Sequence, residues 1–112
     1  MQYMLLMAAV PDAPPAPPDL DAPSEWLDEM SARDVERGGA RLRPAEEART
    51  VRVRSDDTLV THGPYAELQE QVAGYGLIEA ADLDEAIEIA AKHPSARLGA
   101  IEIRPVWPLS DA

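Results

Sequence analysis

Two segments of strand length are apolar on both of their alternating faces, and this pattern restricts the fold more than any other feature of the sequence. In residues 2–9 the odd and the even positions are both apolar. In residues 72–80, Tyr75 and Leu77 fall on one side and Ile78 on the other. Because successive side chains of a strand point to opposite faces, both segments should be covered on both faces. We therefore expect them to be the central strands of one sheet.

The length of the chain sets the number of cores. A chain of 112 residues buries enough surface for one core, so residues 1–112 are expected to form a single domain. A proline-rich loop over residues 11–22 and a tail over residues 105–112 lie outside its regular elements. The chain contains no Phe, so Leu, Ile, Val, Met and Ala must build a thin core that oligomerisation would help.

Two helices are predicted from apolar periodicity. The first spans residues 23–37 and ends at Gly38-Gly39, since glycine tolerates the left-handed conformation found just beyond helix ends. The second begins at the N-cap Asp82, where Glu85 completes a capping box. The expected buried faces carry Trp26, Leu27, Met30 and Val35 in the first helix, and Leu83, Ala86, Ile87, Ala90 and Ala91 in the second.

A hairpin and two further strands complete the expected elements. Residues 50–54 alternate cleanly, which places Val51 and Val53 inward, and residues 58–61 return as the second arm. A short strand is expected at residues 40–42 and an edge strand at residues 100–104. This order predicts an α+β fold of the ferredoxin-like βαββαβ type, with an inserted β-hairpin and a mainly antiparallel sheet.

Two helices can cover only one face of such a sheet. The second apolar face of the central strands then needs another cover, and a second copy of the chain is the simplest one. We therefore expect a homodimer through the sheet face, with a cavity between the two copies.

Charge and composition exclude several classes of function. The net charge is −11 and Lys92 is the sole lysine, so a nucleic-acid partner is not expected. The first apolar run lacks a basic start and is far shorter than a membrane span, which favours a cytoplasmic protein without a membrane partner. With no Cys and two histidines 31 positions apart, neither a metal site nor a cofactor is predicted.

Side chains suited to acid–base chemistry gather in residues 61–79. His62 is the candidate catalytic acid or base, because imidazole titrates near neutral pH, and Glu67 or Glu70 could orient it. The structural alternative is a loop histidine that caps a turn. Hydroxyl, carboxylate and guanidinium groups that could bind a ligand, or simply pack and form ion pairs, are those of Tyr65, Glu70, Tyr75 and Arg104.

Two other features allow a functional and a structural interpretation. Gly74 and Gly76 flank Tyr75, and glycine inside a strand marks the close approach of another backbone or of a ligand, or else a bend or bulge. His93 precedes Pro94 at the end of the second helix, where a cation is favourable, so a structural role is expected for it.

The chain resembles the YCII-related, DGPF-domain family in the run Thr61-His62-Gly63-Pro64-Tyr65-Ala66-Glu67, followed by Glu70-Gln71, Gly74-Tyr75 and Leu77-Ile78-Glu79. The resemblance implies a dimeric α+β barrel-like fold, bacterial origin and genetic association with extracytoplasmic-function sigma factors. It also implies a histidine–aspartate active site in the members that act on small molecules. His62 and Tyr65 depart from the family motif, which has Asp and Phe there.

Three functions remain open from the sequence. The first is a bacterial regulatory or accessory protein that binds a small ligand or a protein partner such as a sigma factor. The second is a non-metal enzyme of the lyase or isomerase type, acting on a small hydroxylated or aromatic metabolite through His62. The third is a structural interaction module, since a fold by itself does not select a function.

Overall fold

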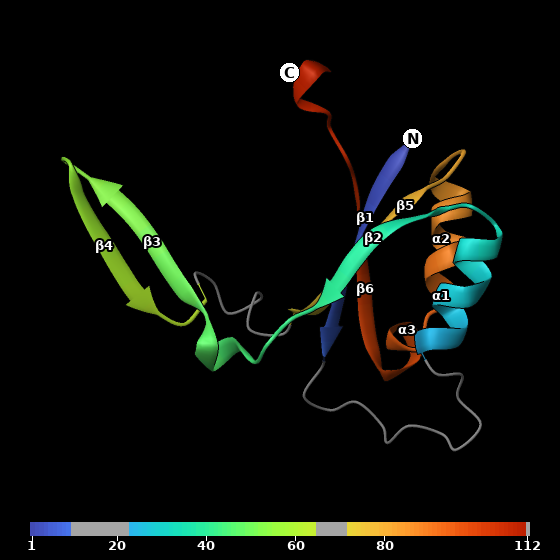
Figure 1. The fold of residues 1–112 in the computed structure, drawn as a ribbon, viewed down its shortest axis with the longest axis horizontal. Coiled ribbons are helices and arrows are strands. Elements are labelled where there is room, and N and C mark those ends of the chain that lie inside the picture. Colours follow the sequence, from blue (N-terminus) through green and yellow to red (C-terminus); the bar gives the residue numbers. More distant parts are fainter. Residues whose placement is uncertain (10–22, 65–71, 112) are drawn as a thin grey trace.

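The computed structural model describes residues 1–9, 23–64 and 72–111 and shows an α+β fold with one main sheet and a separate hairpin (Figure 1). The main sheet has the strand order β2-β5-β1-β6, and all of its neighbouring strands are antiparallel. This is the ferredoxin-like arrangement with an inserted hairpin that the order of elements predicted. The strands of this sheet are β1 (Gln2–Ala9), β2 (Glu36–Arg41), β5 (Val72–Glu79) and β6 (Gly99–Pro105).

The two segments that are apolar on both faces are the central strands, as expected. β1 pairs with β5 on one side and with β6 on the other. Tyr3, Leu5 and Met7 of β1 are buried on one face, and the residues between them are half-buried on the opposite face. We call this second face, which carries Met4, Leu6, Tyr75 and Leu77, the far face of the sheet.

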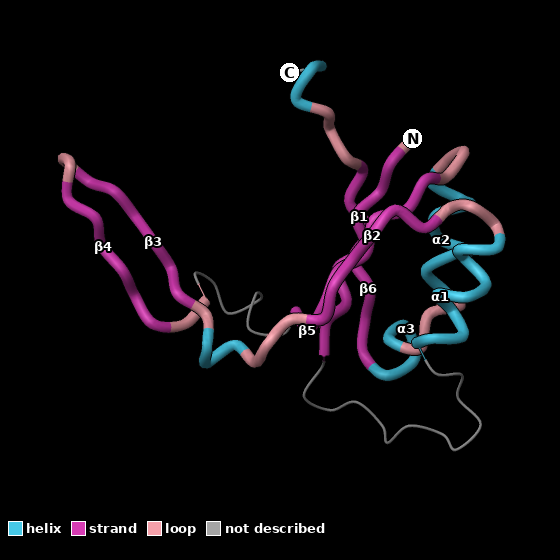
Figure 2. Tube along the Cα trace, viewed as in Figure 1, coloured by secondary structure: helices cyan, strands magenta, loops and turns pink. Residues whose placement is uncertain are grey.

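All helices of the described chain except two short 3-10 turns lie against the other face of the sheet (Figure 2). The N-cap of α2 is as predicted, because the Asp82 carboxylate accepts the Glu85 N–H at 2.9 Å and Glu85 in turn accepts the Ala81 N–H. The elements outside the sheet are α1 (Pro23–Ala32), α2 (Leu83–Ala91), α3 (Ser95–Leu98) and the 3-10 turns η1 (Ala45–Glu47) and η3 (Leu109–Asp111).

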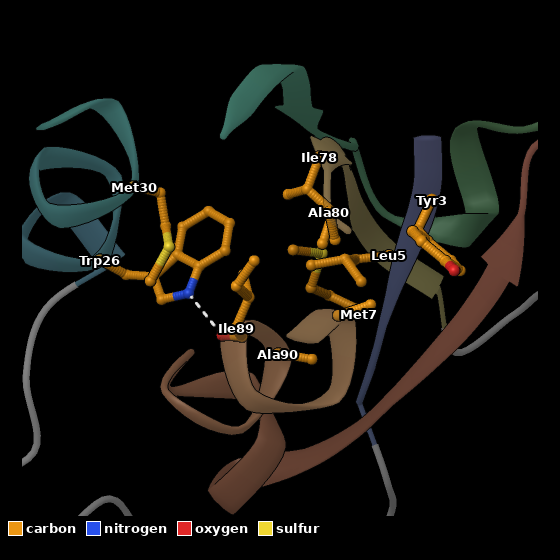
Figure 3. Packing of buried hydrophobic residues seen from close by; sticks show 10 residues of the cluster. Tyr3, Leu5, Met7, Trp26, Met30, Ile78, Ala80, Ile89 and Ala90 are labelled. Atoms are coloured by element: carbon orange, nitrogen blue, oxygen red, sulfur yellow. Dashed lines mark hydrogen bonds between the residues drawn. The ribbon is translucent and has the colours of Figure 1, made fainter. Parts of the chain in front are cut away.

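The core lies between the sheet and α1 and α2, where Trp26 joins the two helices (Figure 3). Its indole Nε1 donates a hydrogen bond to the Ile89 carbonyl oxygen at 2.9 Å, inside the core. Met30, Ile78 and Leu5 are fully buried beside it. The indole therefore fills core volume and also satisfies a polar group of a helix that lies far away in the sequence.

The end of α1 differs from the prediction. The helix stops at Ala32 instead of continuing to position 37, and Gly38 and Gly39 lie within β2. Asp34 takes the left-handed conformation (φ 56°), and the Val35 N–H bonds to the Met30 carbonyl. This Schellman arrangement ends a helix as a glycine would, because aspartate also tolerates left-handed backbone.

The buried face of α2 also differs from the prediction. Leu83 and Ile87 are each 49% exposed, whereas Ile89 is fully buried. The face turned to the sheet follows the spacing i, i+3, i+4 from Ala86, so it contains Ala86, Ile89 and Ala90. Because this face of α2 is turned to the sheet, the Ile89 carbonyl reaches the Trp26 indole. The apolar periodicity of α2 alone does not predict this contact.

The hairpin of β3 (Arg49–Arg54) and β4 (Asp57–His62) forms as predicted but does not pack inward. It projects away from the sheet on the side opposite to the helices (Figure 1). The radius of gyration is 16.1 Å, against about 13 Å for a compact chain of this length. The expectation that Val51 and Val53 point into a core is therefore wrong within one copy, where they are 61% and 59% exposed.

No helix in residues 1–9, 23–64 and 72–111 is both long and apolar enough to cross a membrane.

Replacing Trp26 with Phe should lower the free energy of unfolding by about 1–3 kcal/mol, since the buried Ile89 carbonyl loses its donor and the smaller ring leaves a gap. Urea unfolding followed by circular dichroism measures the change. Leu83→Ala, at a half-exposed position of the other helix, should cost less than half as much. Equal losses in the two variants would contradict the anchoring role of the indole.

Candidate functional site

The candidate site is a cavity of about 580 Å³ between the sheet and the helix layer. It is lined by residues of β1, α1, β2 and β5 and of the link between α2 and α3. Gly39, Gly74 and Gly76 form part of its floor. The absence of side chains at these positions on the helix side of the sheet leaves this space open.

The glycines act in two ways. A Cβ on Gly39 would collide with the Tyr75 carbonyl oxygen, so this glycine is required by the close approach of β2 and β5. A Cβ on Gly74 would lie 3.0 Å from the Ala40 carbonyl oxygen, which is also tight. At Gly76 the nearest atom would be Met7 Cε at 3.5 Å, an ordinary contact, so here glycine leaves usable space. The prediction of close backbone approach at Gly74 and Gly76 thus holds at Gly74, while a Cβ at Gly76 would make ordinary van der Waals contacts.

His93 is buried and lines the cavity beside Trp26. The two rings meet edge to face, with centroids 4.9 Å apart. The Nδ1 atom accepts the Ser95 N–H at 3.0 Å, so in the neutral ring the proton sits on Nε2. Burial lowers the pKa of His93 and favours this neutral form. The sequence marks this helix end as favourable for a cation, whereas burial of the ring favours the neutral form.

Charged groups at the cavity come from β2. The Glu36 carboxylate accepts the Gly38 N–H and is held against its own strand. Arg41 also lines the cavity, and among the described residues its guanidinium has no ion-pair or hydrogen-bond partner. A guanidinium offers several fixed donors that match a carboxylate or a phenolate, so Arg41 can hold an anionic group there.

The candidate residues that the structure describes, His62, Tyr75 and Arg104, are not gathered in one place. Tyr75 lines the cavity. His62 is exposed at the end of β4, opposite Arg49, and is not among the residues that line the cavity. Arg104 lies in register with Met4 on the far face and pairs with Glu102 at 3.2 Å. Tyr65, Glu67 and Glu70 lie outside the described residues, so the proposed pairing of His62 with Glu67 remains a prediction.

Two residues of the cavity did not emerge from the sequence as site residues. His93 continues the buried spacing of α2, since it follows Ala86, Ile89 and Ala90 at i+7. Starting the apolar periodicity at Ala86 would have placed its ring on the buried side. Arg41 carried no comparable signal, because its place at the cavity depends on the pairing of β2 with β5.

The sheet, the single helix layer and the projecting hairpin define a ferredoxin-like α+β protein with an inserted hairpin. Residues 1–110 match the YCII-related domain, and the chain belongs to this family.

Two relatives illustrate the range of the similarity. An uncharacterised protein of Rhizobium meliloti (strain 1021) is 42% identical over 69 residues, which are 60% of this chain and 56% of that protein. A solved structure of 5-chloro-2-hydroxyhydroquinone dehydrochlorinase from Burkholderia phenoliruptrix AC1100, in complex with 2,5-dihydroxybenzoquinone, superposes with a TM-score of 0.50. The two chains are 14% identical, with 96% of this chain and 94% of that chain covered, so the likeness shows the fold.

Protonation of His93 should destabilise the fold. Its folded-state pKa lies below the ordinary value of about 6.5, so on acidification the unfolded chain binds the proton first. The contribution of the neutral ring is therefore present above this value and lost as the pH falls towards the folded-state pKa. In urea unfolding at pH 7, 6 and 5, the wild type should lose more stability on acidification than His93→Asn, whose amide oxygen can still accept the Ser95 N–H. Superimposable pH profiles would contradict this role.

Proposed function

We propose that this chain binds a small, flat and mostly apolar molecule that carries an anionic or hydroxyl group. The observation that carries the proposal is the cavity of about 580 Å³, a size typical of small-molecule sites. Its walls are mainly apolar, with a few polar groups from β2 and from the segment after α2, as expected of a site that takes up an apolar body and orients it by a small number of hydrogen bonds.

The lining side chains indicate the shape and polarity of the ligand. Trp26 and Met7 offer surfaces suited to a ring, and the glycine floor lets a flat molecule approach the sheet closely. Arg41 supplies a positive charge in a chain whose net charge is −11. His93, neutral by burial, supplies a hydrogen-bond donor. A small aromatic acid or a phenol satisfies all of these features.

The dehydrochlorinase with the same fold is a separate source of support, because its solved complex contains a flat hydroxylated ring compound. We propose a binding role of the regulatory or accessory kind, which a sigma-factor partner would fit, ahead of catalysis by His62. The enzymatic alternative requires His62 to face an enclosed space, whereas its side chain is exposed on β4 in the single copy.

We further propose that the chain works as a homodimer through the far face. Met4, Leu6 and Leu77 of the central strands are only half-covered there, and no helix of the described chain lies over them. A second copy would bury this apolar surface and leave the cavity on the opposite side of the sheet accessible.

Filling the cavity should abolish binding without unfolding the chain. In Gly76→Val the Cβ makes ordinary contact with Met7, and the two additional methyl groups occupy the space above the sheet. In a thermal-shift panel of small aromatic acids and phenols, at least one compound should raise the Tm of the wild type and leave that of Gly76→Val unchanged. Circular dichroism confirms that the variant is folded. If no compound in the panel shifted the wild type, the proposed ligand class would be wrong.

Arg41 should make the cavity bind aromatic acids more tightly than neutral phenols. Arg41→Gln should weaken the binding of an aromatic acid by about tenfold or more and alter that of the matching neutral phenol much less. Isothermal titration calorimetry measures both affinities. Arg104→Gln is the matched control, because Arg104 lies on the far face and already pairs with Glu102. Equal weakening by the two substitutions would indicate a general effect of net charge instead of a contact at the cavity.

A further inference from the structure

The hairpin of β3 and β4 carries an uncovered apolar surface. Val51, Val53 and Val60 are 61%, 59% and 57% exposed. Val51 pairs directly with Val60, and Val53 lies two positions further along the same strand, so all three side chains point to one side. We call this side the valine face.

The two sides of the hairpin differ in polarity. Arg52, Arg54 and Thr61 occupy the side opposite to the valine face, where Leu59 is the one large apolar side chain of the two strands. A strand pair that alternates in this way is built to bury one side and to leave the other in water. The valine face is therefore the side that a partner surface should cover.

The described residues of a single copy do not provide this cover. β3 and β4 contact each other, and no other helix or strand of the described chain packs extensively against them. A two-stranded hairpin without a third strand or a helix against its apolar side is marginally stable in water. An ordered hairpin therefore needs an apolar surface that residues 1–9, 23–64 and 72–111 of one copy do not supply.

We propose that a second copy of this chain covers the valine face, so that each hairpin of the dimer lies across the other copy. This inference rests on the far-face dimer proposed above and extends it. The hairpin projects on the side of the far face, opposite to the helices (Figures 1 and 2). One copy docked on the far face thus stands on the side to which the hairpin reaches, and the two-fold symmetry of a dimer repeats the contact.

Charge complementarity favours a second copy as the occupant. β3 contains three arginines and no acidic residue within a chain that has 21 acidic and 10 basic residues. The turn and β4 add Asp56 and Asp57, so the hairpin has a small excess of positive charge in a strongly acidic protein. Of the arginines, Arg49 lies on the valine face, where an acidic second copy attracts it. The valine side chains and the adjacent Arg49 can therefore contact the same partner.

The arrangement gives His62 a new environment. Arg49 and His62 form the last pair of the hairpin, and both lie on the same side as Val51 and Val60. A copy that covers the valine face therefore borders His62 as well. Any ligand contact or acid–base step of His62 would then take place between subunits, outside the glycine-floored cavity.

The first experiment places a charge on either side of the hairpin of the full chain. Val60→Arg should weaken dimerisation roughly tenfold or more, because a guanidinium replaces a central apolar contact. Thr61→Arg adds the same side chain to the opposite side and should sediment like the wild type. Analytical ultracentrifugation over a concentration series measures both. Equal weakening by the two variants, or none by Val60→Arg, would overturn the proposal.

The second experiment separates this contact from the far-face dimer. Leu77→Arg charges the far face and should dissociate the dimer, and amide hydrogen exchange over residues 49–62 should then accelerate because the hairpin loses its cover. If Leu77→Arg gives monomers whose hairpin exchanges as slowly as in the wild type, the far-face dimer stands and the hairpin contact does not. A wild type that is monomeric at micromolar concentration would overturn both, while ligand binding in the cavity would be untouched.

Discussion

The structure depends on a mismatch between sheet and helices. The two central strands, β1 and β5, are apolar on both faces of the sheet. The helices of the described chain cover one of these two faces. On the covered face the buried Trp26 indole ties α1 to the backbone of α2 and satisfies a carbonyl in the core. On the far face half-buried methionine and leucine side chains remain next to water. The chain thus completes one half of a layered core and presents the other half for association.

The cavity arises from the same sheet. At Gly39 and Gly74 the approach of the two backbones leaves little or no room for a Cβ, whereas at Gly76 the missing side chain opens space below the helices. His93 closes this space from the end of α2, and its burial keeps the ring neutral. A ligand site on the helix side and an association surface on the other side can therefore exist together without competing for the same residues.

Local signals predicted most of the fold. The capping box at Asp82, the turn between β3 and β4 and the alternation in β6 depend on neighbours in the sequence, and the structure has all three. The predictions for the end of α1 and for the buried face of α2 were wrong. In both places the local sequence fits two structures almost equally well. The left-handed residue that ends α1 is Asp34, which precedes the two glycines. In α2 the side that contains Ile89 packs on the sheet, and the side that contains Ile87 is exposed. Local periodicity does not distinguish these outcomes, because the packing partner decides them.

The amino-acid sequence by itself determined the central strands, the order of elements and the family, since these follow from apolar alternation, caps and a motif that is contiguous in the chain. Only the tertiary structure decided which side chains share a cavity. Arg41, Gly76 and His93 come from a strand, another strand and a helix link, and they line one cavity because β2 pairs with β5 beneath that link. The pairing of distant segments thus moved the candidate site from the His62 loop to the glycine-floored side of the sheet.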